Sequence, residues 1–182
     1  SRLATGLGEV IAADFDNDGF VDLFSWSNFK LYKNINGMEF IPFDFPELPP
    51  SVSLGACWGD FDRDGYVDLY VGGYEDWGNG ITYPDLFLMN EKGKAFRLAR
   101  TDSQHRARGV TACDYDFDGA PEIYVSNYRL QPNLLWDRNG SGNFENKAPA
   151  SNVVATSDTF GGGHSIGAAW GDFNNDGLID LF

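Results

Sequence analysis

The chain has few of the side chains from which enzyme active sites and zinc sites are most often built. It contains two histidines and two cysteines among 182 residues, whereas a catalytic triad or a zinc site gathers several such groups at one point. His164 and Ser165 are adjacent in sequence, and adjacency alone does not produce the geometry of a nucleophile and its base. We therefore expect no enzymatic activity, and we keep a lyase or hydrolase acting on sugars as the alternative.

Basic residues and long apolar runs are also scarce. The 13 Lys and Arg residues face 27 Asp and Glu residues, so the formal net charge is −14. Nucleic acid binding requires a basic surface, and we therefore exclude nucleic acid as a partner. No apolar run has the length of a transmembrane helix, and no signal peptide is visible.

More than half of the acidic residues lie in a nine-residue motif that occurs four times. The copies are residues 14–22 (DFDNDGFVD), 60–68 (DFDRDGYVD), 114–122 (DYDFDGAPE) and 172–180 (DFNNDGLID). Positions 1, 3, 5 and 9 carry an acid or an amide, and position 6 is Gly, which permits a sharp turn. Alternate side chains of such a tightly curled loop converge on one point.

These convergent oxygens predict up to four Ca²⁺ sites, because calcium is a hard cation that takes six to eight oxygen ligands. Clustered carboxylates repel one another unless a cation lies between them, and magnesium is less suited because it demands a rigid octahedron. An ordinary Asp-Gly turn is the alternative for any single copy. The predicted ligands are Asp14, Asp16, Asp18, Asp22, Asp60, Asp62, Asp64, Asp68, Asp114, Asp116, Asp118, Glu122, Asp172, Asn174, Asp176 and Asp180.

An EF-hand does not fit this motif. It needs a Glu at position 12, where the first three copies have Ser25, Val71 and Val125. It also needs flanking helices, whereas the segments after the motifs read VDLFSW, VDLYVGG and PEIYVSN, which are typical of strands. We therefore expect loops that join two strands.

The motifs start at residues 14, 60, 114 and 172, and a spacing of this size indicates a propeller, solenoid or array. Each repeat predicts four antiparallel strands, which make one blade of an all-β propeller. We expect one repeat region, 1–182, with blades at about 5–45, 52–100, 107–148 and an incomplete one at 164–182. The chain starts and stops within this pattern, and three and a half blades do not close a ring, so we expect a fragment that forms an open arc of a larger ring.

Other positions of the repeat predict core and loops. The aromatic residue at motif position 2 is expected in the core, namely Phe15, Phe61, Tyr115 and Phe173. Cys57 and Cys113 stand at different distances before their motifs, which favours two unpaired residues over a disulfide. Two long loops are candidates for partner binding: Gly72–Pro84, with Tyr74, Glu75, Asp76, Trp77 and Tyr83, and Lys147–Ser165, with Phe160, Gly161 and His164. Packing of each loop on its own aromatics is the alternative.

The stretches Trp58–Leu69 and Trp170–Leu181 follow the pattern W-G-D-F-D-x-D-G-x-x-D-L. With this pattern the chain resembles the FG-GAP/VCBS repeat family, which includes propellers similar to the seven-bladed head of integrin α chains and secreted proteins of the cartilage acidic protein type. The resemblance implies that the open arc is part of a seven-bladed ring. The resemblance implies an extracellular or cell-surface setting, where calcium is abundant. Copies one and three lack the Trp, and copy three ends in the longer Glu122.

Together these features predict a calcium-binding propeller module in which calcium has a structural role. Its expected partners are an extracellular protein or a glycan, and the remaining blades of a parent propeller. A purely structural spacer is the alternative that the sequence does not separate from a binding module.

Overall fold

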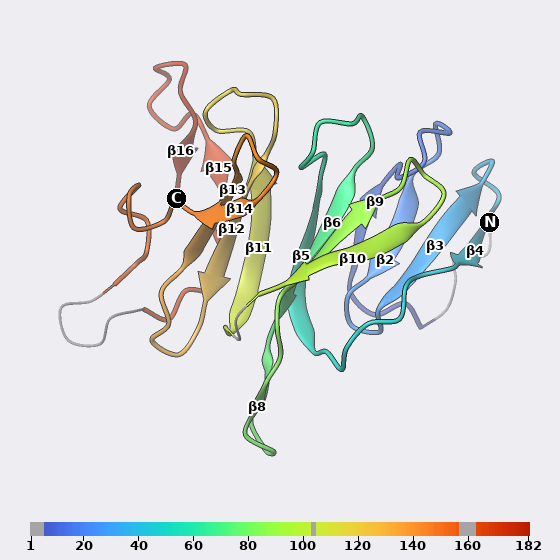
Figure 1. Ribbon diagram of the computed structural model, residues 1–182, viewed down its shortest axis with the longest axis horizontal. Helices are drawn as coiled ribbons and strands as arrows, with labels where there is room; N and C mark the ends of the chain where they lie inside the picture. The colour runs from blue at the N-terminus through green and yellow to red at the C-terminus, as the bar shows by residue number, and fades with distance from the viewer. Residues whose placement is uncertain (1–5, 103–104, 157–162) are drawn as a thin grey trace.

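The computed structural model describes residues 6–102, 105–156 and 163–182, and this part of the chain contains strands and turns without a helix. The strands form antiparallel sheets that follow one another in an open arc (Figure 1). The expected all-β class and the unclosed arc of propeller blades are therefore confirmed. Within the described residues, no helix has the length and apolarity that a membrane crossing requires.

Three sheets have four strands each, in the order in which their strands follow along the chain. Their strands are β1 (Val10–Ala13), β2 (Asp22–Ser25), β3 (Lys30–Ile35) and β4 (Glu39–Phe43); β5 (Ser53–Gly59), β6 (Asp68–Gly73), β9 (Leu86–Asn90) and β10 (Phe96–Thr101); and β11 (Ala107–Cys113), β12 (Glu122–Asn127), β13 (Leu134–Arg138) and β14 (Phe144–Asn146). A fourth, two-stranded sheet pairs β15 (Trp170–Gly171) with β16 (Asp180–Leu181). We call these sheets blades one to four.

The middle strands carry the core. Every residue of β6, β9 and β12 is buried, because a neighbouring blade covers each face of these strands. The inner strands β5 and β11 lie next to each other and use small residues where the backbones approach. A Cβ on Gly109 would lie 2.5 Å from the carbonyl oxygen of Ile166, so only glycine fits at this inner position.

The aromatic residue at motif position 2 is buried where the next blade covers it. Phe15 packs against Phe96 of blade two at 5.7 Å between ring centroids, and Phe61 packs against Phe144 of blade three at 6.2 Å. Both rings are at most 2% exposed. In blade three, the half-buried Tyr115 stacks on Trp170.

Phe173 does not follow this pattern, and its expected core position is wrong. Its side chain is 61% exposed, and its ring contacts the ring of Phe182 at 5.9 Å. The reason is that no further blade among the described residues lies against it, in contrast to Phe15 and Phe61.

The loop expected over Gly72–Pro84 contains a small hairpin of its own. Strands β7 (Glu75–Asp76) and β8 (Ile81–Thr82) pair, and the hairpin projects from the arc on the side opposite the motif loops (Figure 1). The four motif loops all lie along the upper edge in that view, because each joins the first strand of a blade to the second. The two cysteines form no disulfide, as expected; Cys57 is buried and Cys113 is half-buried.

Candidate metal centres

Each motif folds into a compact loop that its own aspartates hold together. In the second loop, the carboxylate of Asp60 accepts hydrogen bonds from the backbone amides of Asp64 (3.0 Å) and Gly65 (2.9 Å). The carboxylate of Asp64 accepts one from the amide of Tyr66 (3.0 Å). The first and fourth loops repeat these bonds at the matching residues. The acids are thus fixed at short distances from one another.

Two left-handed residues shape every loop. The glycine at position 6 has a φ between 87° and 94° in all four copies, as the motif predicts. Position 4 is also left-handed, with φ between 59° and 61° at Asn17, Arg63, Phe117 and Asn175. This role of position 4 was not predicted from the sequence, although the two asparagines are a signal for it, because Asn tolerates this conformation.

Position 4 also joins neighbouring blades. The side-chain amide of Asn17 donates to the carbonyl oxygen of Gly65 in the second loop at 2.8 Å. The guanidinium of Arg63 donates to the carbonyl oxygen of Asp118 in the third loop at 2.7 Å. The loops therefore form a connected row along one edge of the arc.

Three loops bring carboxylates to within metal-binding distance. In each, one oxygen from each of three acids lies within 4.8 Å of the other two. The groups are Asp14, Asp16 and Asp18; Asp60, Asp62 and Asp68; and Asp114, Asp116 and Glu122. Asp22, Asp64 and Asp118 lie in the same loops outside these groups of three. An oxygen-only donor set of this kind suits a hard divalent cation.

The acid at position 9 is buried and bound to the backbone. Asp22 accepts the amides of Phe15 (3.1 Å) and Asn34 (2.7 Å), and Asp68 accepts the matching amides of blade two. Burial raises the pKa of Asp22 to about 6 and that of Asp68 to about 7, although these hydrogen bonds oppose the shift. The buried negative charge is therefore only partly compensated.

The same burial raises the pKa of Glu122 to about 8. In this third loop one oxygen, Oδ1 of Asp114, is buried and has no hydrogen-bond partner in the part of the chain that the structure describes. In the other loops the matching oxygen accepts the amide of position 5. An orphaned carboxylate oxygen that faces two further acids fits a bound cation.

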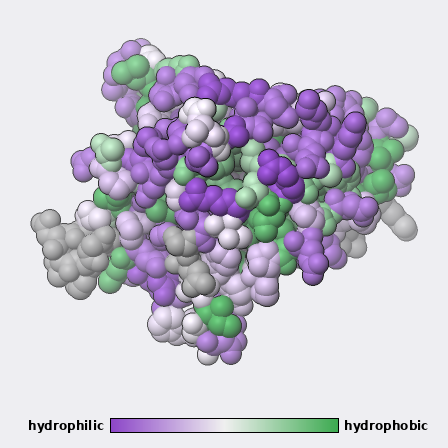
Figure 2. Space-filling model, in the orientation of Figure 1, coloured by the Kyte–Doolittle hydropathy of each residue, from purple (hydrophilic) through white to green (hydrophobic). Residues whose placement is uncertain are grey.

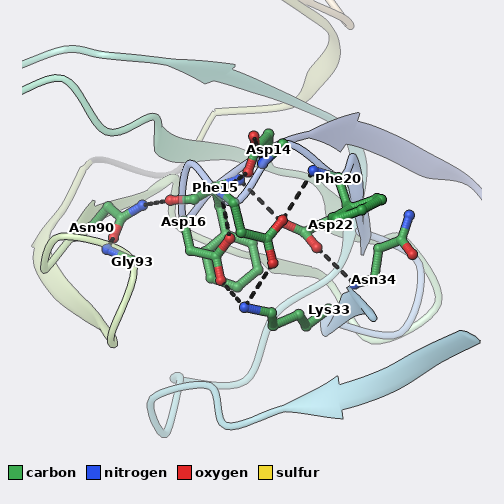
Figure 3. A network of polar contacts seen from close by, with 11 residues as sticks. Asp14, Phe15, Asp16, Phe20, Asp22, Lys33, Asn34, Asn90 and Gly93 are labelled. Carbon is green, nitrogen blue, oxygen red and sulfur yellow. Dashed lines mark hydrogen bonds and ion pairs between the residues drawn. The ribbon is translucent and has the colours of Figure 1, made fainter. Parts of the chain in front are cut away.

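The first loop already contains a cation of its own. The ammonium group of Lys33 contacts the carboxylate of Asp16 (Figure 3). It also contacts the carboxylate of Asp18, at 3.0 Å. This contact lowers the pKa of Asp18. Strand register places Met89 and Asp137 at the matching positions of blades two and three, so the internal ammonium is specific to the first loop.

The fourth loop has the most exposed ligands. Asp172, Asn174 and Asp176 are exposed, and Asp180 is half-buried. The amide of Phe173 nevertheless donates to Asp180 at 3.1 Å, as the matching amides do in the other loops. The four predicted ligands therefore lie in one loop. Three of them are carboxylates, whereas each of the first three loops has four.

Asp85, Asp102 and His105 form another close group, which the sequence analysis did not single out. Asp85 accepts hydrogen bonds from the Tyr70 hydroxyl (2.6 Å) and the Gly73 amide (2.6 Å). In blade three, Asn133 takes the same place, bonded to the Tyr124 hydroxyl and the Asn127 amide. This repetition indicates that Asp85 has a structural role between the second and third strands of its blade.

The long loops do not pack on their own aromatics throughout. Trp77 at the tip of the β7–β8 hairpin is 69% exposed and carries the Arg129 guanidinium over its ring at 3.8 Å. The exposed His164 meets the ring of Tyr128 edge-on. Phe160 and Gly161 lie outside the described residues.

The comparison with known protein families agrees with the repeat. The model of the FG-GAP-like repeat matches residues 14–71 and 114–182, which cover more than half of the chain. No curated protein sequence matches the chain.

Proposed function

The chain belongs to the family of FG-GAP-like repeats, and we propose that it is a propeller module whose acidic loops bind structural calcium. Bound Ca²⁺ would supply positive charge to the clustered carboxylates and fix each loop between the first two strands of its blade. Asp60, Asp62 and Asp68, with their equivalents in the other loops, would hold the ion.

The observation that carries this proposal is the partly compensated charge of the loops. Asp68 is fully buried, and it stands within 4.8 Å of two other aspartates. Burying such a charge costs free energy unless a cation or hydrogen bonds compensate it. Calcium that binds only to the folded state stabilises it, by about 2.7 kcal/mol per site at a hundredfold excess over Kd.

We further propose that the module binds rather than catalyses, and that it works outside the cell or at the cell surface. The acidic loops lie along one edge of the arc, which leaves the opposite edge, with the β7–β8 hairpin, free to contact an extracellular protein or glycan (Figure 1). Loops held on a rigid scaffold are the usual place for such contacts.

Thermal unfolding of the chelator-treated protein tests the calcium proposal. The melting temperature should rise when calcium is added and should rise much less with magnesium, which prefers a rigid octahedral site. Asp60→Asn should reduce the calcium-dependent rise, whereas Asp44→Asn, which changes an exposed acid outside the loops, should not. Equal effects of calcium on both variants would contradict the proposal.

A further inference from the structure

Three arginines of this acidic chain line one pocket. The pocket has a volume of about 310 Å³ and lies between blades two and three, where Arg97 and Arg100 of β10 face Arg138 at the end of β13. No acidic residue is among those that line it. Figure 2 shows hydrophilic side chains gathered over the middle of the face where Figure 1 places β10.

A β-bulge brings the first two arginines together. Residues three apart point to opposite faces of a regular strand, but the pairing of β10 with β9 shifts between Leu98 and Arg100. Ala99 is the extra residue, and Arg97 and Arg100 therefore share the face towards blade three. Bulges often re-aim a side chain in this way at functional positions.

Arg100 forms the side of the pocket that lies against aromatic rings. Its guanidinium lies over the rings of Phe87 (5.5 Å) and Trp136 (5.1 Å) and donates to the carbonyl oxygen of Phe144 at 2.9 Å. It also pairs with Asp102 at 3.3 Å. These contacts fix its orientation, so little conformational entropy is lost when a ligand binds.

Arg138 brings a charge that the protein does not balance. Its Nε donates to the carbonyl oxygen of Gly142 at 3.2 Å, and its terminal nitrogens have no carboxylate or carbonyl partner within the described part of the chain. Gly142 has a φ of 84°, and a Cβ there would lie 3.2 Å from a terminal nitrogen of Arg138. The turn thus leaves room for this guanidinium, while Arg97 pairs weakly with the exposed Glu91 at 3.8 Å.

The junction of blades one and two has no such cluster of arginines. Strand register places Ile41 and Phe43 of blade one where blade two has Arg97 and Arg100. It places Asn90 of blade two where blade three has Arg138. The repeat itself therefore does not require these arginines, and their gathering is particular to the junction of blades two and three.

We propose that this pocket binds a phosphate or sulfate group, carried as a free ion or as an ester on a sugar. Guanidinium groups bind such oxyanions through paired, charge-assisted hydrogen bonds. In this pocket Arg97 and Arg100 each pair with one carboxylate, whereas Arg138 has no carboxylate partner among the described residues. The pocket therefore has enough positive charge to hold a single group of this kind. The inference stands apart from the calcium proposal, because none of the acidic loops contributes to the pocket.

Calorimetric titrations with inorganic sulfate, inorganic phosphate and a sulfated disaccharide test the proposal at low ionic strength. We expect one saturable site that weakens with added salt. Arg138→Gln and, separately, Arg97→Gln should each weaken binding by about tenfold, the equivalent of one lost charge-assisted hydrogen bond. Lys30→Gln removes the same charge from an exposed position in blade one and should leave affinity unchanged.

The outcomes separate the sources of the anion. Tighter binding of the sulfated disaccharide than of either free ion assigns the site to a glycan ester, and equal binding assigns it to the free ion. The proposal is overturned if none of the probes binds saturably, or if Lys30→Gln weakens binding as much as Arg138→Gln. Calcium-dependent melting of the arginine variants should match that of the unmodified protein, which shows that a loss of anion binding is not a loss of fold.

Discussion

The ammonium group of Lys33 contacts the carboxylate of Asp16 inside the first acidic loop. It occupies the side of the loop on which blade two has the uncharged Met89. A tethered ammonium and a calcium ion compete for the same carboxylates, because both compensate the same negative charge. The four loops are therefore chemically unequal although their motifs are nearly identical.

Lys33→Met should strengthen calcium binding at the first loop. An ammonium group and a calcium ion that shared these carboxylates would repel each other, by at least about 1 kcal/mol at a separation of about 4 Å, so we expect affinity to rise roughly tenfold when the ammonium is removed. Calorimetry should show one additional tight site in the variant. Lys30→Met, on the same strand and exposed, is the control, and identical isotherms for all three proteins would contradict the competition.

Asp85→Asn should make stability less dependent on pH. Burial raises the pKa of Asp85 to about 7, with Asp102 adding to the shift and Tyr70 opposing it, whereas an unfolded Asp titrates near about 4. The protonated carboxyl is thus preferred in the folded state. Its contribution is complete below about pH 4 and is lost as the pH rises through about 7.

Asn can bond the same two groups as Asp85, as Asn133 does in blade three. There the Asn133 side-chain oxygen accepts the Asn127 amide, and its side-chain amide donates to the Tyr124 hydroxyl. The variant should therefore be more stable than the unmodified protein by at least about 1 kcal/mol at pH 8 and nearly equal to it at pH 4. Denaturant unfolding at the two pH values measures this difference. A variant that is less stable at pH 8 would show that Asp85 is favoured as a carboxylate.

Glu75→Gln should loosen the β7–β8 hairpin. Glu75 is 8% exposed and pairs with Arg106 and Arg129, both at 2.7 Å, so it ties the hairpin of blade two to blade three. Because both arginines are partly exposed, we expect a loss of about 1–2 kcal/mol. Trp77→Ala, at the exposed tip, should cost less than about 1 kcal/mol. Equal losses in chemical unfolding would contradict this division of roles.

Asn90→Ala should weaken the contact between blades one and two. The buried Asn90 amide donates to the carbonyl oxygens of Phe15 (2.7 Å) and Val67 (3.0 Å), and removing it leaves buried carbonyls without a partner, at about 1–3 kcal/mol. Asn34 has the same place in blade one, but among the described residues its side-chain amide donates only to the carbonyl oxygen of Val21. Thermal melts should therefore show a larger loss for Asn90→Ala than for Asn34→Ala, and the reverse order would exclude the bridging role.

The sequence predicts those features that depend on residues close together in the chain. The position of the acids and of Gly19 within one motif determines the loop, and the apolar segments after it determine the second strand. The repetition of this unit then predicts the blades. These elements agree with the structure because local turn chemistry and the repeat point to the same fold.

The features that the sequence does not predict depend on strand register and on the next blade. Lys33 of β3 meets Asp16 of the loop between β1 and β2, and Arg100 shares a face with Arg97 only because Ala99 forms a bulge. Phe173 has the same motif position as Phe15, and its exposure depends on the presence of a covering blade. Neither register nor the neighbouring blade is visible in a single nine-residue motif.

The central claim is that the acidic loops are calcium sites, and a calorimetric titration of calcium into metal-free protein tests it most directly. We predict saturation at three to four ions per chain, with calcium bound more weakly at the first loop than at the second and third, and little heat with magnesium. An absence of calcium-specific heat would show that the motifs are turns held by their own hydrogen bonds, and would contradict the claim.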